Sequence, residues 1–368
     1  MTAPAGIYVH IPFCLTRCGY CDFNAYAGLD ELKPRYLAAL FREAELAAPG
    51  WAGTAFVSVF LGGGTPTTME PDDLRALLGH LHDRFEMASD AEVTIEANPD
   101  TVTEASLSGL LDAGFARLSI GAQSFDPAVL RSLERIHQAT SVRAAVAGAR
   151  RAGFRNLSLD LIYGANGESL ESWRRTLDET VALGPEHVSA YALTIEPATA
   201  LGREVAAGEV PGPDPDLQAD MFLLACEVLD AAGYGHYEIS NWARPGFECV
   251  HNLGYWERRP YVGLGAGAHG YRDDVRWWNI RPPETYMEKV ESGDLPIGGS
   301  ESLDPSDAYL EEVFLKLRIL EGVPASWFDA GRYEPYVQSG LLIDDFGQLV
   351  PTERGMLLLN ELVLGLTG

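Results

Sequence analysis

Three cysteines near the start of the chain have the residue type and spacing to bind a metal centre. Cys14, Cys18 and Cys21 lie in the stretch HIPFCLTRCGYCDFNAY, spaced C-x3-C-x2-C, and no fourth cysteine follows close behind. Three thiols can neither pair off as disulfides nor complete a four-cysteine metal cage. Because thiolates select soft or borderline metals, a zinc ion and an iron-sulfur cluster are the two alternatives, and each needs a further ligand.

The spacing favours a 4Fe-4S cluster over structural zinc. A zinc ion could recruit His10 as its fourth ligand, but C-x2-C knuckles usually come in pairs and this chain has no second one. A cluster held by three cysteines keeps one iron free for a ligand from outside the protein. The sequence therefore predicts a cluster on these three cysteines, with zinc as the alternative.

Several predicted strands run into residues that could contact a small ligand. In a parallel βα barrel such residues gather at the C-terminal ends of the strands. Glycines let the backbone come close to a ligand, and buried carboxylate, amide, hydroxyl and guanidinium groups each need a hydrogen-bond partner. The set would suit a ligand with an amino acid end and hydroxyls. Its members are Gly63, Gly64 and Thr65 in LGGGTPT, Glu96 in IEANPD, Gln123 in SIGAQSF, Arg135 on the following helix and Asp160 in LDLIYG.

Six β-rich runs alternate with helical patterns through the first two thirds of the chain, which predicts an α/β fold with a parallel sheet. Six successive βα units favour an incomplete barrel of the TIM type, and GYGHYEIS is expected to add a last edge strand. The predicted strands are 6–11, 55–61, 92–97, 117–122, 156–162 and 187–193.

At 368 residues the chain exceeds the ~250–300 residues at which one core usually stops growing, so a second domain is expected. We predict the barrel over residues 1–240 and a connecting region rich in glycine and aromatic residues over 241–304. A smaller domain follows over 305–368, where LLIDD, a glycine-containing turn and LVPT predict a hairpin of a winged-helix-like fold.

The composition argues against several classes of protein and indicates a cellular compartment. The 53 acidic and 27 basic residues give a formal net charge of -26, which repels phosphate backbones and argues against a nucleic-acid partner. No apolar stretch approaches the ~20 residues that span a bilayer, and the N-terminus lacks the features of a secretory signal. Five cysteines, two of them isolated, do not form a disulfide framework. We expect a cytoplasmic protein.

The cysteine spacing after a first strand, followed by GGGTPT, resembles the radical S-adenosylmethionine superfamily. The resemblance implies a partial (β/α)6 TIM-like barrel. It also implies that the open iron is chelated by the amino and carboxylate groups of S-adenosylmethionine, and that the second glycine run contacts the amino group. The fourth ligand that three cysteines leave open would then be the cofactor.

Closer similarity covers nearly the whole chain. The motifs YVHIPFC, LGGGTPT, IEANPD, SIGAQSF, LERIH, DLIYG, YEISN, HNLGYW and GLGAGAHG together resemble the HemW-type haem chaperones, relatives of the oxygen-independent coproporphyrinogen III oxidase HemN. By this resemblance Cys14, Cys18 and Cys21 hold the cluster. The residues implied to line the S-adenosylmethionine site are Tyr8, Tyr20, Gly63, Gly64, Thr65, Glu96, Gln123, Arg135 and Asp160.

Two departures from the oxidase favour the chaperone branch. The oxidase motif continues C-x2-C-x-C, whereas this chain has Phe23 at that position, and it begins only seven residues before Tyr8, which we take to leave no room for the oxidase's N-terminal extension. We therefore expect a chaperone without oxidase activity that binds a 4Fe-4S cluster, S-adenosylmethionine and haem. It would deliver haem to acceptor haemoproteins such as respiratory cytochromes.

Two other functions stay open as alternatives. One is a radical S-adenosylmethionine enzyme acting on a tetrapyrrole, as a coproporphyrinogen III oxidase or a methyltransferase. The other is a purely structural zinc protein. For the chaperone we name no catalytic residue, and we expect a monomer or homodimer without a membrane span, leaving transient membrane association open.

The stretch HNLGYW resembles the HNxxYW motif of the chaperone family. His251 could ligate haem iron, while Tyr255 and Trp256 could offer flat apolar surface to the macrocycle. The alternative is that His251 hydrogen-bonds locally and the two aromatic residues fill a domain junction. Cys249 is a further candidate ligand, and His269 and His10 are weaker ones. We interpret GLGAGAHG as tight backbone packing, not a phosphate loop.

Overall fold

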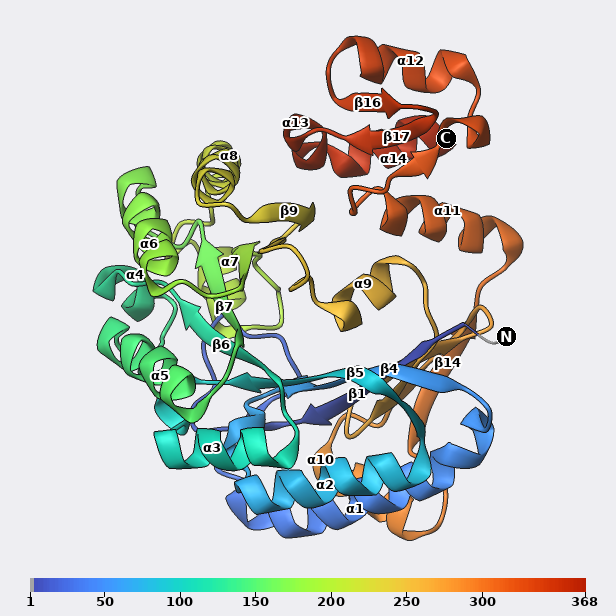
Figure 1. Ribbon diagram of the computed structural model, residues 1–368. Helices are drawn as coiled ribbons and strands as arrows, with labels where there is room; N and C mark the ends of the chain where they lie inside the picture. The colour runs from blue at the N-terminus through green and yellow to red at the C-terminus, as the bar shows by residue number, and fades with distance from the viewer. Residues whose placement is uncertain (1–2) are drawn as a thin grey trace.

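The computed structural model describes residues 3–368 and is built on one twelve-stranded sheet. All six predicted strands are present and pair in parallel, in chain order, around a curved surface that opens at both edges (Figure 1). The predicted partial (β/α)6 barrel is thereby confirmed. Its strands are β1 (Ala5–Ile11), β4 (Ala55–Gly63), β5 (Glu86–Ala97), β6 (Arg117–Gln123), β7 (Asn156–Tyr163) and β8 (His187–Ala192).

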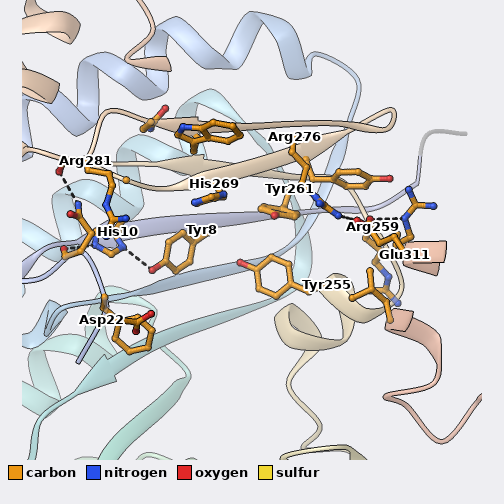
Figure 2. A pocket seen from close by; sticks show the side chains of 18 residues that line it. Tyr8, His10, Asp22, Tyr255, Arg259, Tyr261, His269, Arg276, Arg281 and Glu311 are labelled. Atoms are coloured by element: carbon orange, nitrogen blue, oxygen red, sulfur yellow. Dashed lines mark hydrogen bonds and ion pairs between the residues drawn. The ribbon is translucent and has the colours of Figure 1, made fainter. Parts of the chain in front are cut away.

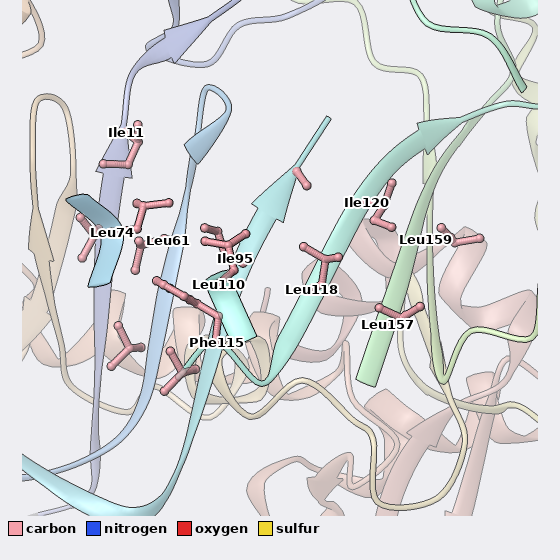
Figure 3. Packing of buried hydrophobic residues seen from close by; sticks show 14 of the residues in the cluster. Ile11, Leu61, Leu74, Ile95, Leu110, Phe115, Leu118, Ile120, Leu157 and Leu159 are labelled. Carbon is pink, nitrogen blue, oxygen red and sulfur yellow. The ribbon is translucent and has the colours of Figure 1, made fainter. Parts of the chain in front are cut away.

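Helices between the strands cover the outer face of the sheet (Figure 1). Figure 3 shows the core beneath them, where Ile11, Leu61 and Ile95 of neighbouring strands lie close to Leu74 and Leu110 of two helices. These side chains are fully or almost fully buried. The helices of the barrel are α1 (Lys33–Ala47), α2 (Pro71–Arg84), α3 (Glu104–Ala113), α4 (Pro127–Ser132), α5 (Ala139–Ala152), α6 (Leu170–Leu183), α7 (Ala200–Ala207) and α8 (Pro215–Ala231).

Residues after 232 extend the sheet at both edges. Two strands continue it beyond β8, and β11 pairs in parallel with β1 and begins an antiparallel extension on the other side. A methyl group on Gly263 would overlap the carbonyl oxygen of His269, so the backbone is tightly packed here, as interpreted from GLGAGAHG. The added elements are β9 (Gly235–Glu238), β10 (Asn241–Ala243), α9 (Val250–Trp256), β11 (Tyr261–Leu264), β12 (His269–Arg272), β13 (Val275–Asn279), α10 (Pro283–Glu291) and β14 (Ile297–Ser302).

A smaller C-terminal domain with its own apolar cluster lies on the inner side of the sheet, beyond α9 (Figure 1). Its three-stranded antiparallel sheet contains the predicted hairpin, which turns at Phe346 and Gly347, both with positive φ. Helices beside this sheet give the winged-helix-like form. The elements are α11 (Pro305–Lys316), β15 (Val323–Pro324), α12 (Ala330–Gln338), β16 (Leu342–Asp345), β17 (Gln348–Pro351), α13 (Glu353–Leu357) and α14 (Leu359–Thr367).

The placement of Arg135 on a helix is wrong. The segment after β6 forms two helices, because α4 ends at Ser132 and α5 begins only at Ala139. Glu134, in the gap, has a φ of 52°, a left-handed conformation that ends the helix. Arg135 therefore lies in this break and not on a helix. Among residues 3–368, no helix has both the length and the apolar character needed to cross a bilayer.

A buried carboxylate ties the antiparallel extension to helix α1. Glu43 accepts hydrogen bonds from the Gly265 amide (2.7 Å), the Asn279 side chain (2.6 Å) and the Tyr286 hydroxyl (2.6 Å). Burial raises the pKa of this carboxyl to about 7, although the three hydrogen bonds act in the opposite direction. One side chain thus fixes the turn after β11, strand β13 and helix α10.

We expect the Glu43→Ala substitution to lower the free energy of unfolding by ~3 kcal/mol or more, because it leaves three buried donors without an acceptor. Urea denaturation at pH 8 measures this difference. Glu45→Ala, on the same helix, is the control, since Glu45 pairs with Arg42 and Arg84 at the surface and its loss should leave the midpoint nearly unchanged. Equal midpoints for the two variants would contradict the role assigned to Glu43.

Candidate functional site

The inner face of the barrel is polar because the strand sequences alternate. In β5, β6 and β7 the residues at one set of alternate positions are apolar and pack under the helices, while the others face the hollow of the barrel. The register aligns Glu96 with Ser119, and Ser119 with Ser158, across three neighbouring strands. Polar groups from different strands therefore share one surface.

All thirteen predicted site residues line a single cavity of about 510 Å³ at the C-terminal ends of the strands. Each of the six parallel strands of the barrel contributes to its wall, and so does α9. The predicted residues are Tyr8, Cys14, Cys18, Tyr20, Cys21, Gly63, Gly64, Thr65, Glu96, Gln123, Arg135, Asp160 and His251.

The cysteine loop is fixed at its base by the glycine run after β4. The Gly64 amide donates to the Ile11 carbonyl and the Thr65 amide to the Phe13 carbonyl, both at 2.8 Å. A Cβ atom on Gly64 would meet these same backbone atoms, so this close approach requires glycine. Cys14 Sγ lies 3.5 Å from Thr65 Oγ1 and forms a hydrogen bond with it.

The three thiols are half-buried, and none is in a disulfide. Burial raises the pKa of Cys21 to about 11 and that of Cys14 as well, with the neighbouring cysteines adding to the effect. Burial therefore disfavours free thiolates here, and a bound cation would have to stabilise them. Within residues 3–368 no three or more Cys, His, Asp or Glu side chains are arranged to hold one metal ion. Thiols set apart in this way fit a cluster in which each cysteine ligates a separate iron.

Arg135 places a positive charge beside the cysteine loop. Its Nη1 donates to Cys18 Sγ (3.3 Å) and its Nη2 to the Gly121 carbonyl (3.3 Å), whereas the buried Nε–H has no partner among the described residues. A buried donor without a partner is costly unless a ligand satisfies it. The guanidinium is thus suited to an anionic cluster or to the carboxylate of a ligand.

Two buried carboxyls face the same cavity from neighbouring regions of the sheet. Burial raises the pKa of Glu96 to about 7, with the charge of Asp160 adding to the effect, and burial also raises the pKa of Asp160. Glu96 accepts from the Gly63 amide (3.1 Å), and the Ser119 hydroxyl lies 2.9 and 2.8 Å from the two oxygens of Asp160. A cationic ligand would stabilise the ionised form of both groups.

Gln123 adopts an uncommon backbone conformation at the end of β6. Its φ is 62°, in the left-handed region that non-glycine residues rarely visit, and the register between β6 and β7 shifts at this point. Such conformations cluster at ligand sites, where the surroundings hold them in place. The strained turn presents the Gln123 amide to the cavity.

His251 lies within helix α9, and its ring is almost completely buried. Its Nδ1 forms a hydrogen bond with the Ser58 hydroxyl and its Nε2 with the Tyr255 hydroxyl, both at 2.9 Å, and the ring stacks on Phe60. Burial lowers the pKa of this imidazole to about 3. Ligation of a metal by His251 would require at least one of these hydrogen bonds to break.

The sequence analysis does not name several polar residues of the inner face of the barrel. The alternation of polar and apolar residues along the strands could have identified them. The strands EVTIEA, RLSIGA, NLSLDL and HVSAYA each place polar groups two positions apart, which is the period of one face of a strand. Arg117 is the only cationic residue among those named below. It is buried near Glu92 and its Nε has no hydrogen-bond partner among residues 3–368. The missed residues of the cavity wall are Arg117, Ser119, Ser189 and Tyr191.

Comparison with known proteins gives three findings. The sequence model of the radical SAM superfamily matches residues 8–180. The "Heme chaperone HemW" of Mycobacterium tuberculosis H37Rv is 44% identical over 99% of this chain and 95% of its own length, and that of Escherichia coli K12 is 34% identical over 98% and 97%. The solved structure of coproporphyrinogen III oxidase HemN from E. coli, described as a radical SAM enzyme, superimposes with a TM-score of 0.86 at 26% identity, covering 99% of this chain and 90% of that one.

Proposed function

The chain belongs to the radical S-adenosylmethionine superfamily and, within it, to the HemW-type haem chaperones, and on this premise we propose that it binds a 4Fe-4S cluster, S-adenosylmethionine and haem and delivers the haem to acceptor haemoproteins. The observation that carries the proposal is the convergence of three cysteines and of charged and polar side chains from every barrel strand on one cavity. A respiratory cytochrome is the kind of acceptor we expect.

In this proposal Cys14, Cys18 and Cys21 hold the cluster. When bound, such a cluster supplies an iron with a vacant coordination position for an outside ligand. The Gly63–Thr65 segment supports this role, because its backbone hydrogen bonds fix the loop that carries Cys14. Arg135 offsets negative charge at Cys18.

The remaining residues of the cavity are proposed to hold S-adenosylmethionine. Its sulfonium and amino groups would face Glu96 and Asp160, whose ionised forms burial disfavours until a cation is present. The unpartnered Nε–H of Arg135 suits the ligand's carboxylate. Tyr8 and Tyr20 offer aromatic surface and Gln123 an amide to the rest of the ligand.

The chaperone assignment is preferred to an oxidase acting on coproporphyrinogen. Phe23 stands where the oxidase motif has a further cysteine, and this residue is 63% exposed in the wall of the cysteine cavity. We also propose a cytoplasmic location, in keeping with five cysteines that are all unpaired.

Anaerobic reconstitution tests the proposal. The protein is refilled with iron and sulfide and desalted, and then its iron and acid-labile sulfide are counted and S-adenosylmethionine and haem are titrated. We expect four iron and four sulfide per chain and saturable binding of both ligands. Protein without inorganic sulfide, or protein that binds no haem, would overturn the proposal. Formation of vinyl groups from coproporphyrinogen together with 5′-deoxyadenosine would instead support the enzyme alternative.

A further inference from the structure

A second cavity, of about 810 Å³, lies beside the cysteine cavity. It is bounded by the inner faces of β1, β11, β12 and β13 and by residues of α9 and α11 (Figure 2). Tyr8, Asp22, Phe23 and Tyr255 line both cavities, so the two share a wall. The volume lies within the ~300–1,000 Å³ range of small-molecule and cofactor sites.

Arginines outnumber acidic residues in the lining of this second cavity, although the whole chain carries a net charge of -26. Arg258, Arg259, Arg276 and Arg281 outnumber its two acidic residues, Asp22 and Glu311. In an acidic protein, such an excess of arginine favours an anionic ligand where a guanidinium is left without an acidic partner.

The arginines differ in how they are already paired. Arg258 and Arg276 both form ion pairs with Glu311, and each has a second acidic partner, Asp274 for Arg258 and Glu301 for Arg276. Arg259 pairs with Glu257. Arg281 has an exposed side chain with no ion-pair or hydrogen-bond partner among residues 3–368. Its guanidinium is therefore free to bind a carboxylate, the group that arginine recognises best with two parallel hydrogen bonds.

Aromatic rings form much of the remaining wall. Tyr255 and Tyr261 pack edge to face with their ring centroids 4.7 Å apart, and Tyr271 and Trp278 line the opposite, antiparallel part of the sheet. Flat apolar surface and the free guanidinium of Arg281 together match a large planar molecule with a carboxylate at its edge. Haem, with its two propionates, is such a molecule.

Of the three histidines considered as haem ligands, two have both ring nitrogens occupied. His10 donates from Nε2 to the Asn24 carbonyl (3.0 Å), so its Nδ1 accepts from the Tyr8 hydroxyl (2.9 Å). His251 is held in the same way by Ser58 and Tyr255. Neither imidazole has a lone pair to offer while these bonds persist.

His269 is different. It is exposed at the start of β12, and its ring has no hydrogen-bond partner among the described residues. Figure 2 shows it across the cavity from Tyr8 and Tyr255, between Arg281 and Arg276. Burial and the charges of Arg281 and Arg276 lower the pKa of the imidazole, which favours the neutral form that ligates metals.

We propose that haem binds in this second cavity with His269 as a ligand of the iron and with Arg281 facing a propionate. The inference rests on the proposed function, because it presumes that the chain carries haem. It places the macrocycle against Tyr8 and Tyr255, next to the cysteine cavity but outside it. His251 then supports the wall by holding Tyr255 and does not touch the iron.

Titration with two probes tests the assignment, using iron(III) haem and metal-free protoporphyrin IX on the full-length reconstituted protein. His269→Ala should weaken haem binding by at least about tenfold and shift the Soret band, yet leave the affinity for metal-free porphyrin unchanged, because only the iron bond is lost. Arg281→Ala should weaken the binding of both probes. His82→Ala and Arg131→Ala, which change exposed residues outside both cavities, are the matched controls.

The outcomes separate the two proposals. If wild-type protein binds haem and His269→Ala leaves both the Soret band and the affinity unchanged, the assignment is overturned while the haem function stands. A shift of the Soret band in His251→Ala but not in His269→Ala would likewise overturn the assignment of His269 and would identify His251 as the iron ligand. If wild-type protein binds neither probe, the proposed function itself fails. Thermal melting of each variant verifies that it is folded.

Discussion

The Cys18→Ala variant is expected to lose most of its iron and acid-labile sulfide after anaerobic reconstitution, together with the visible absorbance of the cluster. The reason is that a 4Fe-4S cluster held by three protein thiolates has no spare cysteine to replace a missing one. Cys18 lies in a half-exposed loop, so removal of its thiol should leave the barrel folded. Iron and sulfide analysis gives the result, and circular dichroism verifies the fold.

Cys226→Ala is the matched control for this experiment. Cys226 is buried in α8 within the main apolar core and lines neither cavity, so its thiol should not contribute to the cluster. The control should retain wild-type iron and sulfide. A Cys18→Ala protein that also keeps its full cluster would refute the assignment of the three-cysteine site.

The affinity for S-adenosylmethionine is expected to rise by about tenfold between pH 6 and pH 8. Glu96 has a pKa of about 7 in the protein without ligand, because it is buried. A bound sulfonium cation favours the ionised carboxylate and lowers this pKa, so binding releases a proton and strengthens as the pH rises through 7. Equilibrium dialysis or calorimetry at several pH values measures the slope.

The Glu96→Gln variant isolates the contribution of this carboxyl. Glutamine keeps an oxygen that can accept from the Gly63 amide, so the glycine segment should stay in place. We expect weaker binding at pH 8 and a flatter dependence on pH, with any remaining slope coming from the α-amino group of the ligand, whose ordinary pKa is ~7.7–8.0. An identical slope in wild type and Glu96→Gln would exclude Glu96 as the titrating group.

Much of the site could be predicted from sequence because its signals are local. Cys14, Cys18 and Cys21 are close in the chain, so their spacing alone suggests a shared ligand. Glu96, Gln123 and Asp160 could be placed together because parallel strands bring their C-terminal ends to one edge, and the structure does place them on one cavity. Their roles in binding remain predictions.

Other features of the site could be recognised only in the folded structure. The helical period continues through residues 126–153, and only the positive φ of Glu134 breaks the helix and turns Arg135 back to the cysteine loop. The arginine-lined second cavity could not be predicted from the sequence either. Its arginines come from β13 and from the segments that follow α9 and β13, which fold onto β1 from more than two hundred residues away.

The sequence by itself determined the barrel, the cysteine loop and the polar inner face, because cysteine spacing and the two-residue period of a strand act over a few neighbouring positions. Only the tertiary structure decided which histidine keeps a free ring. His251 is held by Ser58 and His10 by Asn24, whereas His269 has no such partner among the described residues. Hydrogen bonds between distant segments depend on how those segments pack, and no local pattern encodes them.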